Sequence, residues 1–470
     1  MNTTQKTLDE YKALLTGSSV AYERLTALFD EGTFLETGRF VKSKTTPADE
    51  TEGNEFEGVV TGYGAVDGRL VFAYAQDPSR MKGAMSEAQA KKIVALYDAA
   101  LKAGAPVVAL LDSVGAKVEE GVAVLSGYAS VMKAVASASG VIPQITVVCG
   151  VCSGSLATIA SMTDVVVAVK DAKYYVSAPI ALTAKGAKNA GSIGNAAENG
   201  SVSIVAEDAF AAVSKAKAIV ALLPSNNVEG SAYTETTDTM NRTVASASLE
   251  EVADAGSVVE LGAENGKSIK TALATVGGMT VGFVAVDGKI CPFCVRKAAK
   301  FVAFCDSFQI PVVTLVNCDG TVCDPKAEEV PFAAKLAQLA CVYASSTTAK
   351  VTVITGNAFG TAFSILGSKA LGADVVLATE NAKIAALPTE AGVEFLYGDE
   401  IKQAEDPAAK KAELTAAYEQ AASPVEAARN GDIDDVIEAS ELRIRIAAAL
   451  EMLSAKATVS PYKKHGNLPL

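Results

Sequence analysis

Several residue types are scarce in this chain of 470 residues, and each scarcity narrows its chemistry. There is no tryptophan, and the only histidine is His465, close to the end of the sequence. Chemistry that depends on a central histidine is therefore not expected. No cysteine precedes Cys149, and the eight cysteines of a chain of this size indicate buried thiols rather than a disulfide framework.

Basic residues are also in the minority: 41 lysines and arginines face 54 acidic residues, giving a net charge of −13. This charge argues against nucleic acid as a partner, because phosphate binding needs clustered positive charge. Apolar runs of membrane-spanning length are missing, and the first residues are polar and unlike a signal peptide. We therefore expect a soluble, cytoplasmic protein, and its length suggests two domains.

What the sequence does contain is a pair of matching glycine turns. In the first, residues 144–157 form an apolar run, then reach Gly150 and Gly154, then small residues that favour a helix. This order predicts a strand, a tight turn at the glycines and a helix start, whose unpaired N–H groups attract negative charge. Backbone amides placed in this way can form an oxyanion hole without a catalytic side chain.

The second turn repeats the first. Residues 350–363 contain the same apolar run and the same glycine spacing, at Gly356 and Gly360, and the segments after the two turns also match. Such self-similarity indicates a tandem duplication. The first turn also has the spacing of a nucleophile elbow with Cys152 at its centre, which with a late histidine would suggest a thiol hydrolase. Ala358 replaces the cysteine in the second turn, so the repeated feature is the backbone.

Strands alternate with helices in the first half, which predicts an α/β fold built from βαβ units. Two helices are expected within residues 4–36, and an exposed loop at residues 44–57. An Asp67-Gly68 hairpin follows within residues 59–76. The expected elements continue as a helix at 86–103, a strand at 106–111, a helix at 119–137, the first turn, strands at 165–169 and 174–176, a loop at 186–203 and a helix at 209–223.

The second half repeats this plan. A polar segment at residues 224–246 is expected to link a first domain, residues 1–223, to a second domain, residues 247–470. The expected elements of the second domain are a strand at 279–286 with a turn at Asp287-Gly288, a helix at 295–308, a strand at 311–316, a helix at 327–345, the second glycine turn, a charged helical segment at 398–430 and a helix at 439–453.

An oxyanion hole needs a second donor, and a loop beside each turn can supply it. Residues 112–117 follow the expected strand at 106–111, and residues 317–322 have the same place in the second half. The carboxyl ends of parallel strands meet at one edge of a sheet. Each loop and its glycine turn should therefore border the same crevice.

Four stretches carry a resemblance to a known family: Leu-Asp-Ser-Val-Gly-Ala-Lys-Val-Glu-Glu-Gly at 111–121, Cys-Gly-Val-Cys-Ser-Gly-Ser at 149–155, Asn-Ala-Phe-Gly-Thr-Ala-Phe at 357–363 and Lys-His-Gly-Asn-Leu-Pro-Leu at 464–470. In this order they resemble the carboxyltransferase (beta) subunit of biotin-dependent acyl-CoA carboxylases, of the propionyl-CoA and methylmalonyl-CoA type. The resemblance implies an α/β fold with a tandem duplication of two crotonase-like (ClpP/crotonase) ββα-superhelix domains.

The resemblance also implies where substrates and partners bind. Acyl-CoA would bind the first domain and carboxybiotin the second, with the site shared between subunits of a homo-oligomer, a hexamer of stacked trimers. Carboxybiotin would arrive on a biotin carboxyl carrier protein served by a biotin carboxylase. Carried over by position, the catalytic residues would be Gly154 and Ser155 for the acyl-CoA enolate and Gly360, Thr361 and Ala362 for the biotin ureido oxygen. The substrate-binding residues would be Gly115, Ala116, Ser364 and Lys92, and no metal is implied.

Several site loops depart from the usual sequence of this family. Residues 113–117 read Ser-Val-Gly-Ala-Lys where the family usually has Ser-Gly-Gly-Ala-Arg, and Ser364 stands where an aspartate is frequent. Three alternatives therefore stay open. They are the carboxyltransferase subunit of a sodium-pumping acyl-CoA decarboxylase with membrane partners, a non-catalytic assembly subunit, and a crotonase-like hydrolase or isomerase that uses Glu119 or Glu120 as acid or base.

Three further patterns receive simpler interpretations. The CxxC pairs Cys149/Cys152 and Cys291/Cys294 each have the spacing of half a zinc site, but they lie in different repeats and are expected to be buried thiols. Residues 262–268 resemble a P-loop that is one residue short, and are expected to be a hairpin turn. Clustered basic residues of the first domain form either a solvated face or a site for CoA phosphates: Arg80, Lys82, Lys91, Lys92 and Lys117.

Overall fold

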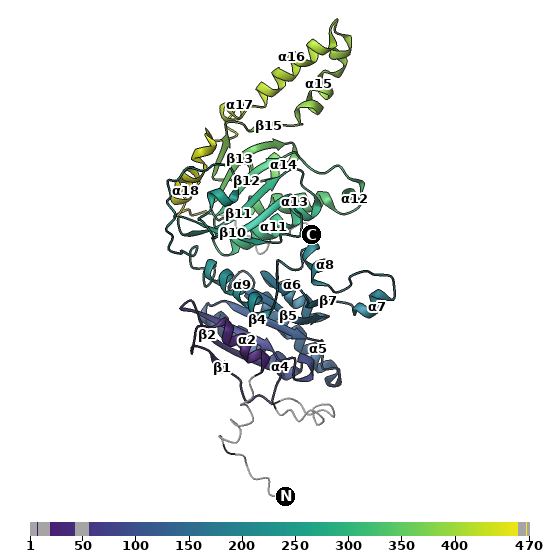
Figure 1. The fold of residues 1–470 in the computed structure, drawn as a ribbon, viewed down its shortest axis with the longest axis vertical. Helices are drawn as coiled ribbons and strands as arrows, with labels where there is room; N and C mark the ends of the chain where they lie inside the picture. The colour runs from purple at the N-terminus through teal and green to yellow at the C-terminus, as the bar shows by residue number, and fades with distance from the viewer. Residues whose placement is uncertain (1–6, 8–18, 43–55, 459–466, 468–470) are drawn as a thin grey trace. The chain divides into compact units, whose positions relative to one another are not determined.

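The computed structural model describes residue 7, residues 19–42, residues 56–458 and residue 467. These residues divide into two compact units, drawn from purple to teal and from teal to yellow in Figure 1. The first unit comprises the residues up to Ala196 together with Val205–Val220, and the second comprises Ala197–Ile204 together with the residues from Ala221 onward. His465, the first of the two helices expected within residues 4–36 and most of the loop expected at 44–57 lie outside the described residues.

A mixed sheet of eight strands organises the first unit. Its strands are β1 (Leu35–Thr37), β2 (Val59–Val66), β3 (Arg69–Gln76), β4 (Val107–Ser113), β5 (Gln144–Ser153), β6 (Val165–Val169), β7 (Lys173–Tyr175) and β8 (Ile204–Ala206). They are ordered β1-β2-β3-β4-β5-β6-β8, with β7 paired to β5. Strands β1 to β3 are antiparallel, and β3 to β6 are parallel. The parallel part therefore carries the carboxyl-terminal edge on which a site can form.

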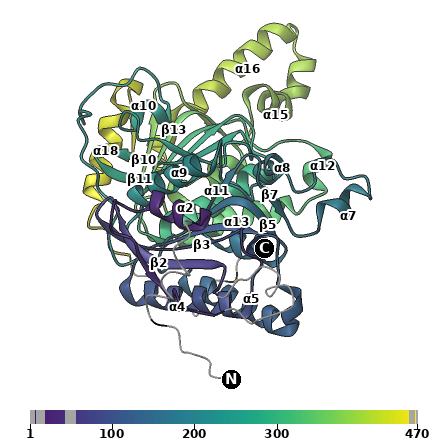
Figure 2. The same ribbon diagram turned by 60° about the horizontal axis from the view of Figure 1, so that its bottom comes forward.

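Helices α4 (Glu87–Ala103) and α5 (Val122–Ala138) pack side by side in the first unit (Figures 1 and 2). Helix α4 begins where Ser86 Oγ accepts a hydrogen bond from the Gln89 N–H at 2.9 Å, and it ends at Gly104, which is left-handed with φ 62°. Its buried residues recur at helical spacing, which fixes the face that packs. The other helices are α2 (Val20–Leu28), α6 (Ser155–Met162), α7 (Pro179–Thr183), α8 (Ile193–Glu198) and α9 (Ala209–Leu222), with 3₁₀ turns η1 (Met81–Gly83) and η2 (Val118–Glu120).

The second unit repeats this sheet. Its strands are β9 (Val259–Leu261), β10 (Ile269–Val276), β11 (Met279–Asp287), β12 (Val312–Cys318), β13 (Lys350–Phe359), β14 (Val375–Thr379), β15 (Lys383–Ala385) and β16 (Asp435–Ile437). They are ordered β16-β14-β13-β12-β11-β10-β9, with β15 paired to β13. The central strands of both sheets are buried on both faces, which explains their continuous apolar sequences.

The helices of the second unit follow the same order as those of the first. Helices α11 (Pro292–Ser307) and α13 (Phe332–Ser345) pack together as α4 and α5 do. The others are α10 (Leu249–Val252), α12 (Pro325–Glu328), α14 (Thr361–Ile365), α15 (Thr389–Gln403), α16 (Pro407–Ala421), α17 (Pro424–Arg429) and α18 (Leu442–Met452), with η3 (Lys369–Leu371) and η4 (Ala439–Glu441). Among the described residues, no helix is both long enough and apolar enough to span a membrane.

An aspartate caps the hairpin at the start of each sheet. In the first unit, Asp30 accepts hydrogen bonds from the N–H groups of Asp67 at 3.1 Å and Gly68 at 2.9 Å. In the second unit, Asp254 accepts from Gly277 at 2.9 Å and Gly278 at 2.8 Å. The same device therefore fixes the turn in both hairpins.

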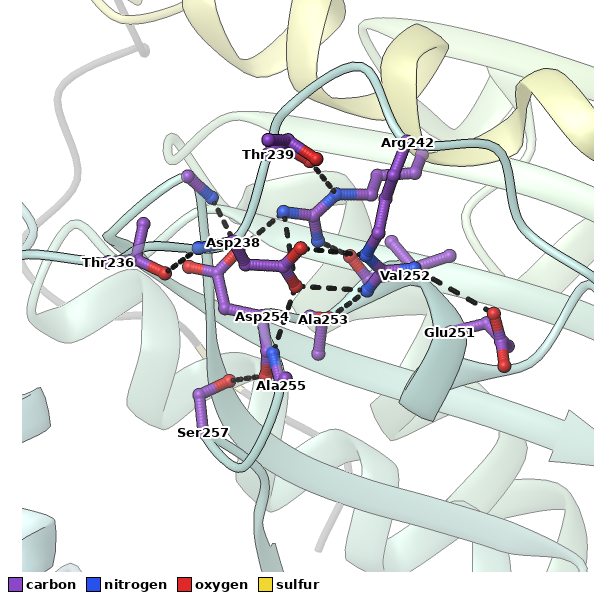
Figure 3. A network of polar contacts seen from close by, with 12 residues as sticks. Thr236, Asp238, Thr239, Arg242, Glu251, Val252, Ala253, Asp254, Ala255 and Ser257 are labelled. Carbon is purple, nitrogen blue, oxygen red and sulfur yellow. Dashed lines mark hydrogen bonds and ion pairs between the residues drawn. The ribbon is translucent and has the colours of Figure 1, made fainter.

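Asp254 also lies at the centre of a polar network (Figure 3). Its Oδ1 is 2.6 Å from Nη2 of Arg443 on α18, a side chain that is fully buried. Asp238 forms an ion pair with Arg242 at 2.8 Å and accepts from the Ala255 N–H at 3.0 Å. Arg443 and Asp238 also approach to 3.7 Å, so the network holds part of the segment 224–246 to the second unit.

Most expected elements are confirmed, and four differ. Gly150 and Gly356 lie inside β5 and β13, so only the second glycine of each pair makes the turn. Helix α8 lies within residues 186–203, which were expected to be a loop. Strand β1 begins at Leu35, so it overlaps the end of the region expected to be helical, residues 4–36. The second hairpin turns at Gly277 and Gly278, whereas Asp287 ends strand β11.

Candidate active site

The two glycine turns have the same backbone conformation. Gly154 joins β5 to α6 with φ 59° and ψ −127°, and Gly360 joins β13 to α14 with φ 59° and ψ −135°. Positive φ with such a ψ is a region that essentially only glycine adopts, which explains the residue type. The repeated glycine pattern of the sequence therefore encodes a repeated local geometry.

Hydrogen bonds fix each turn glycine. The Gly154 N–H donates to the Tyr175 carbonyl at 2.8 Å, and the Gly360 N–H donates to the Ala385 carbonyl at 3.0 Å. The amides that come next, beginning with Ser155 and Thr361, open their helices and have no carbonyl partner within the helix. Each turn thus presents helix-terminal amides, with the positive end of the helix dipole behind them.

A loop lies beside each turn, as the sequence predicts. Met85 forms a bridge to Ala116, with hydrogen bonds from the Met85 N–H to the Gly115 carbonyl and from the Lys117 N–H to the Met85 carbonyl, both 2.8 Å. A Cβ added to Gly115 would lie 3.2 Å from Ser153 Oγ, at the end of β5. The structure therefore brings Gly115 and Ala116 together with the turn at Gly154.

The second unit contains the same bridge. Ile290 pairs with Thr321, through hydrogen bonds from the Ile290 N–H to the Gly320 carbonyl at 3.0 Å and from the Val322 N–H to the Ile290 carbonyl at 2.9 Å. A Cβ on Gly320 would lie 3.8 Å from the Phe359 carbonyl oxygen. Loop and turn are thus neighbours in both units.

The sequence interpretation missed the residue that holds each loop against its turn. The parallel register shifts near the ends of β4 and β12, between Leu111 and Ser113 and between Val316 and Cys318. At the shift, Asp112 Oδ1 accepts from the Val151 N–H at 3.1 Å, and Asn317 Oδ1 accepts from the Asn357 N–H at 2.9 Å. The sequence signal that could have identified these two residues is that each occupies the first position of its loop, 112–117 or 317–322.

These two side chains explain the glycines inside the strands. A Cβ on Gly150 would lie 2.0 Å from Asp112 Oδ1, and a Cβ on Gly356 would lie 2.3 Å from Asn317 Oδ1. Only glycine lets the carboxylate or amide reach the strand backbone. The first glycine of each pair therefore makes room for a neighbour, and the second makes the turn.

The expected substrate-binding residues have different environments. Ser364 is an exposed residue of α14. Lys92 lies on α4, is only 7 % exposed to solvent, and donates from Nζ to the Val59 carbonyl at 2.5 Å. Burial lowers the pKa of Lys92 to about 8, against the opposing effect of nearby glutamates. Within the described residues, no hydrogen bond joins Lys92 to the loop at Gly115.

The basic residues of the first unit do not form a uniform solvated face. Lys91 is exposed and pairs with Glu87 at 2.8 Å. Lys117 is buried, and its Nζ lies 3.9 Å from Glu120 Oε1, which is also buried. Glu120 Oε2 accepts from the Glu87 N–H at 2.7 Å, while Glu119 is exposed. Glu120 therefore caps helix α4 rather than standing free as an acid or base.

The remaining patterns also have local explanations. Cys152 is fully buried, and burial raises the pKa of its thiol, which does not suit a nucleophile. Residues 262–268 connect β9 to β10. Among the described residues, no group of three or more His, Cys, Asp or Glu side chains could hold a metal ion, so neither CxxC pair has further ligands there.

The whole arrangement matches known proteins. The family profile described as the carboxyl transferase domain matches residues 12–468. The chain therefore belongs to the carboxyltransferase family of biotin-dependent acyl-CoA carboxylases, and the resemblance seen in its sequence is confirmed.

Curated relatives match along nearly their full length. The methylmalonyl-CoA decarboxylase subunit alpha of Propionigenium modestum is 36 % identical, over 97 % of this chain and 94 % of the relative. The methylmalonyl-CoA carboxyltransferase 12S subunit of Propionibacterium freudenreichii subsp. shermanii is 34 % identical, over 96 % and 92 %. The propionyl-CoA carboxylase beta chain of Cereibacter sphaeroides is 35 % identical, over 97 % and 94 %.

The fold matches as well. A solved structure of transcarboxylase 12S, described as a hexamer with methylmalonyl-coenzyme A and methylmalonic acid bound, superposes with a TM-score of 0.94 at 31 % identity, covering 100 % of both chains. Both proteins share the α/β architecture of two similar mixed sheets, so the predicted tandem duplication of crotonase-like domains is confirmed.

Proposed function

We propose that this protein transfers a carboxyl group between carboxybiotin and a short acyl-CoA, of the propionyl-CoA and methylmalonyl-CoA size. The observation that carries the proposal is the repeated turn, with φ 59° at both Gly154 and Gly360. Carboxyl transfer between two such partners develops negative charge on two oxygens, one on each partner. Two backbone oxyanion holes match that requirement, and neither needs a histidine.

Each turn would serve one partner. The Ser155 amide, with that of Ala116 from the neighbouring loop, would stabilise the thioester oxygen of the acyl-CoA enolate, and Gly154, whose N–H donates to the Tyr175 carbonyl, would set the turn. Amides at Thr361 and Ala362 would stabilise the ureido oxygen of biotin, and Gly360, whose N–H donates to the Ala385 carbonyl, would set the second turn. Biotin supplies the activated carboxyl group when its carrier is bound, and the residues of this chain hold the charge that transfer creates. Neutral amide donors with no acidic side chain among them fit an anionic oxygen.

The remaining predicted residues would choose and hold the substrate. Ser364 would contribute to the acyl pocket, and Gly115 would let the loop backbone approach the thioester. Lys92 and the exposed Lys91 would favour the CoA phosphates electrostatically. The expected partners are a biotin carboxyl carrier protein with a biotin carboxylase, and a hexamer is the expected assembly because the 12S structure is described as one.

A second candidate is the reverse direction. The 36 % identity to the decarboxylase subunit alpha favours a carboxyltransferase that removes carboxylate from methylmalonyl-CoA and works with membrane decarboxylase subunits. The direction of carboxyl transfer depends on the proteins with which this subunit assembles. Neighbouring genes for a biotin carboxylase would favour carboxylation, and genes for a membrane pump would favour decarboxylation. A non-catalytic assembly subunit is the outcome that remains if no transfer occurs.

Transfer of labelled carboxylate from methylmalonyl-CoA, or from malonyl-CoA, to free biotin tests the proposal. Gly154→Ala and Gly360→Ala keep the backbone N–H but add a Cβ at a positive φ, which strains the turn and misaligns the amides that follow it. Each should therefore lower the rate by about 10²–10³-fold, the size of effect expected for a lost oxyanion-hole donor. Gly68→Ala is the matched control, since Gly68 also has positive φ, 75°, with nothing within 4 Å, but lies in the Asp67-Gly68 hairpin. Equal losses in all three variants would contradict the role of the turns, as would no transfer by folded wild-type protein.

A further inference from the structure

Helix α11 of the second unit begins with two cysteines whose sulfurs touch. Cys291 is the N-cap, and its Sγ accepts a hydrogen bond from the Cys294 N–H at 3.4 Å. The two Sγ atoms are 2.9 Å apart, and both thiols are free. This is the CxxC pair that neither the proposed chemistry nor a metal site explains.

The two sulfurs differ in exposure. Cys291 is partly exposed, whereas Cys294 is 1 % exposed. The loop between β9 and β10 covers Cys294: a Cβ on Gly266 would lie 2.6 Å from the Cys294 nitrogen. The chain therefore offers one accessible sulfur with a second, shielded sulfur directly behind it.

The surroundings favour a thiolate at Cys291. The hydrogen bond from the Cys294 thiol lowers the pKa of Cys291 to about 6, helped by N–H groups of the first helical turn and opposed by burial. The same contact and burial raise the pKa of Cys294. Lys297, on the same helix, interacts electrostatically with both sulfurs and with Glu260 on β9. A helix N-terminus favours a thiolate in any case.

The first unit shows that capping does not require thiols. At the corresponding place, Ser86 Oγ accepts from the Gln89 N–H at 2.9 Å and caps α4. The bridges of Met85 and Ile290 immediately before the caps establish this correspondence. The second unit therefore uses a pair of cysteines where serine and glutamine suffice.

We propose that Cys291 and Cys294 form a redox-active dithiol that a hydroperoxide converts into an intrachain disulfide. The Cys291 thiolate attacks one peroxide oxygen, breaks the O–O bond and becomes a sulfenic acid, with hydroxide as the leaving group when the oxidant is hydrogen peroxide. The Cys294 sulfur then attacks the sulfenic sulfur, its proton leaves with the hydroxyl as water, and the S–S bond forms. The two thiols lose two electrons and the peroxide gains them.

The disulfide would act directly beside the second glycine turn. Cys291 follows Ile290, whose backbone holds the loop through Gly320 and Val322. A changed position of Cys291 would be transmitted to this loop and so to the turn at Gly360. Only this consequence rests on the proposed function, because disulfide formation itself needs no carboxyl transfer.

The full-length protein offers a direct test. After treatment with hydrogen peroxide and blocking of free thiols with iodoacetamide, trypsin should release residues 290–296, which contain both cysteines and no others. We expect oxidation to remove two hydrogens from this peptide and to block alkylation of both its cysteines, and dithiothreitol to reverse both changes. This oxidation should occur at lower peroxide exposure than oxidation of Cys323 and Cys341. Those exposed thiols are the internal controls. Oxidation of the controls first, or a disulfide from Cys291 to any cysteine other than Cys294, would overturn the proposal.

Two variants sharpen the test. Cys294→Ser should stop the reaction at a sulfenic acid on Cys291, which dimedone would label, and Cys291→Ser should abolish both products while keeping the serine cap that the first unit uses. Dimedone labelling absent from Cys294→Ser would contradict the assigned order. Hydrogen exchange at Val322 should change on oxidation of the wild type and not of Cys291→Ser. An inactive but normally oxidised protein would contradict the proposed function alone, and an active protein that forms no disulfide would contradict this inference alone.

Discussion

The hairpin-capping aspartates of the two units make the same pair of hydrogen bonds in very different surroundings. The Asp30 side chain is 32 % exposed and lies 3.8 Å from Lys217. The Asp254 side chain is 3 % exposed and lies 2.6 Å from the fully buried Arg443. Duplication has preserved the local geometry, while burial has changed what each carboxylate contributes to stability. A repeated hydrogen-bond pattern therefore does not imply a repeated energy.

The glycine turns give the complementary lesson. Their φ angles are both 59° and their ψ angles are −127° and −135°, but the side chains that support them differ in charge. Asp112 is held by Arg24 at 2.9 Å, whereas Asn317 donates to Asp287 at 2.8 Å. Either a carboxylate or an amide can supply the oxygen that the strand amide needs. The two units therefore have the same turn geometry although the supporting side chain is charged in one and neutral in the other.

The largest difference between the units should follow removal of the cation beside each capping aspartate. Arg443→Ala leaves Asp254 buried without its charge partner and should cost about 3–5 kcal/mol. Lys217→Ala removes a partly exposed partner of Asp30 and should change the melting temperature little. Thermal unfolding of the two variants checks this. Similar changes in melting temperature for both variants would show that burial does not make the two aspartate–cation pairs differ in their contribution to stability.

Exchanging the supporting side chains of the turns should have the next largest effect. Asn317→Asp places a carboxylate against Asp287 and removes a hydrogen bond to it, so we expect a loss of about 1.5–3 kcal/mol at neutral pH. Asp112→Asn keeps an acceptor for the Val151 N–H but removes the charge that pairs with the largely buried Arg24, so we expect it to lower stability at both pH values. Denaturant unfolding at neutral pH and at about pH 5 measures both, and Asn317→Asp should recover stability on acidification because protonation relieves the repulsion. An unchanged deficit at the lower pH would contradict this cause.

A smaller, pH-dependent effect is expected at Asp30. The hydrogen bond from the Gly68 N–H lowers the pKa of this carboxyl below its ordinary value of 3.8, burial opposes the shift, and the Asp67 N–H and Lys217 assist it. A carboxyl with a lowered folded-state pKa stabilises the protein above its unfolded pKa and loses that contribution as pH falls through the folded value. Asp30→Asn should therefore be less stable than the wild type at about pH 6 and approach it on acidification below about pH 4. Parallel melting curves across this range would exclude the effect.

The smallest effect concerns reactivity and leaves stability unchanged. Because the pKa of Cys291 is lowered to about 6, its alkylation by iodoacetamide should reach half its maximal rate near that pH. Cys294→Ser keeps a hydroxyl donor and should leave the midpoint low, whereas Cys294→Ala removes the first cause of the shift and should raise it. Quantifying the labelled peptide over a pH series separates these variants. An identical midpoint in Cys294→Ala would show that the sulfur contact is not the cause.

Local signals in the sequence predicted much of the fold. The apolar run and glycine of each turn identified β5 and β13, and the Asp67-Gly68 pair identified the first hairpin. The hairpin of the second unit was not predicted, because it turns at Gly277 and Gly278 with no Asp-Gly pair to mark it, and the expected Asp287-Gly288 turn starts one residue late because Asp287 still belongs to β11. Helix α8 was missed, because six residues rich in small side chains give little periodicity.

The candidate site was predictable where it depends on backbone and less so where it depends on distant partners. The glycine spacing identified the turns at Gly154 and Gly360. The reason for Gly150 required knowing that Asp112, from another strand, accepts a hydrogen bond from the N–H of the next residue, Val151. The buried environment of Lys92 was equally hidden, because its acceptor Val59 lies far away in sequence. Contacts of this kind follow from the register of the sheet, which a single sequence does not state.

The placement of Ala197–Ile204 has a consequence for how the protein is made. This segment belongs to the second unit, although the residues on both sides of it belong to the first. It is held there by hydrogen bonds from Asn265 to the Glu198 carbonyl at 2.7 Å and from the Gly262 N–H to the Ser203 carbonyl at 2.7 Å. During synthesis, the first half leaves the ribosome with this segment still waiting for partners that have not been translated. No single cut can therefore divide the chain into two pieces that each contain all of their own contacts.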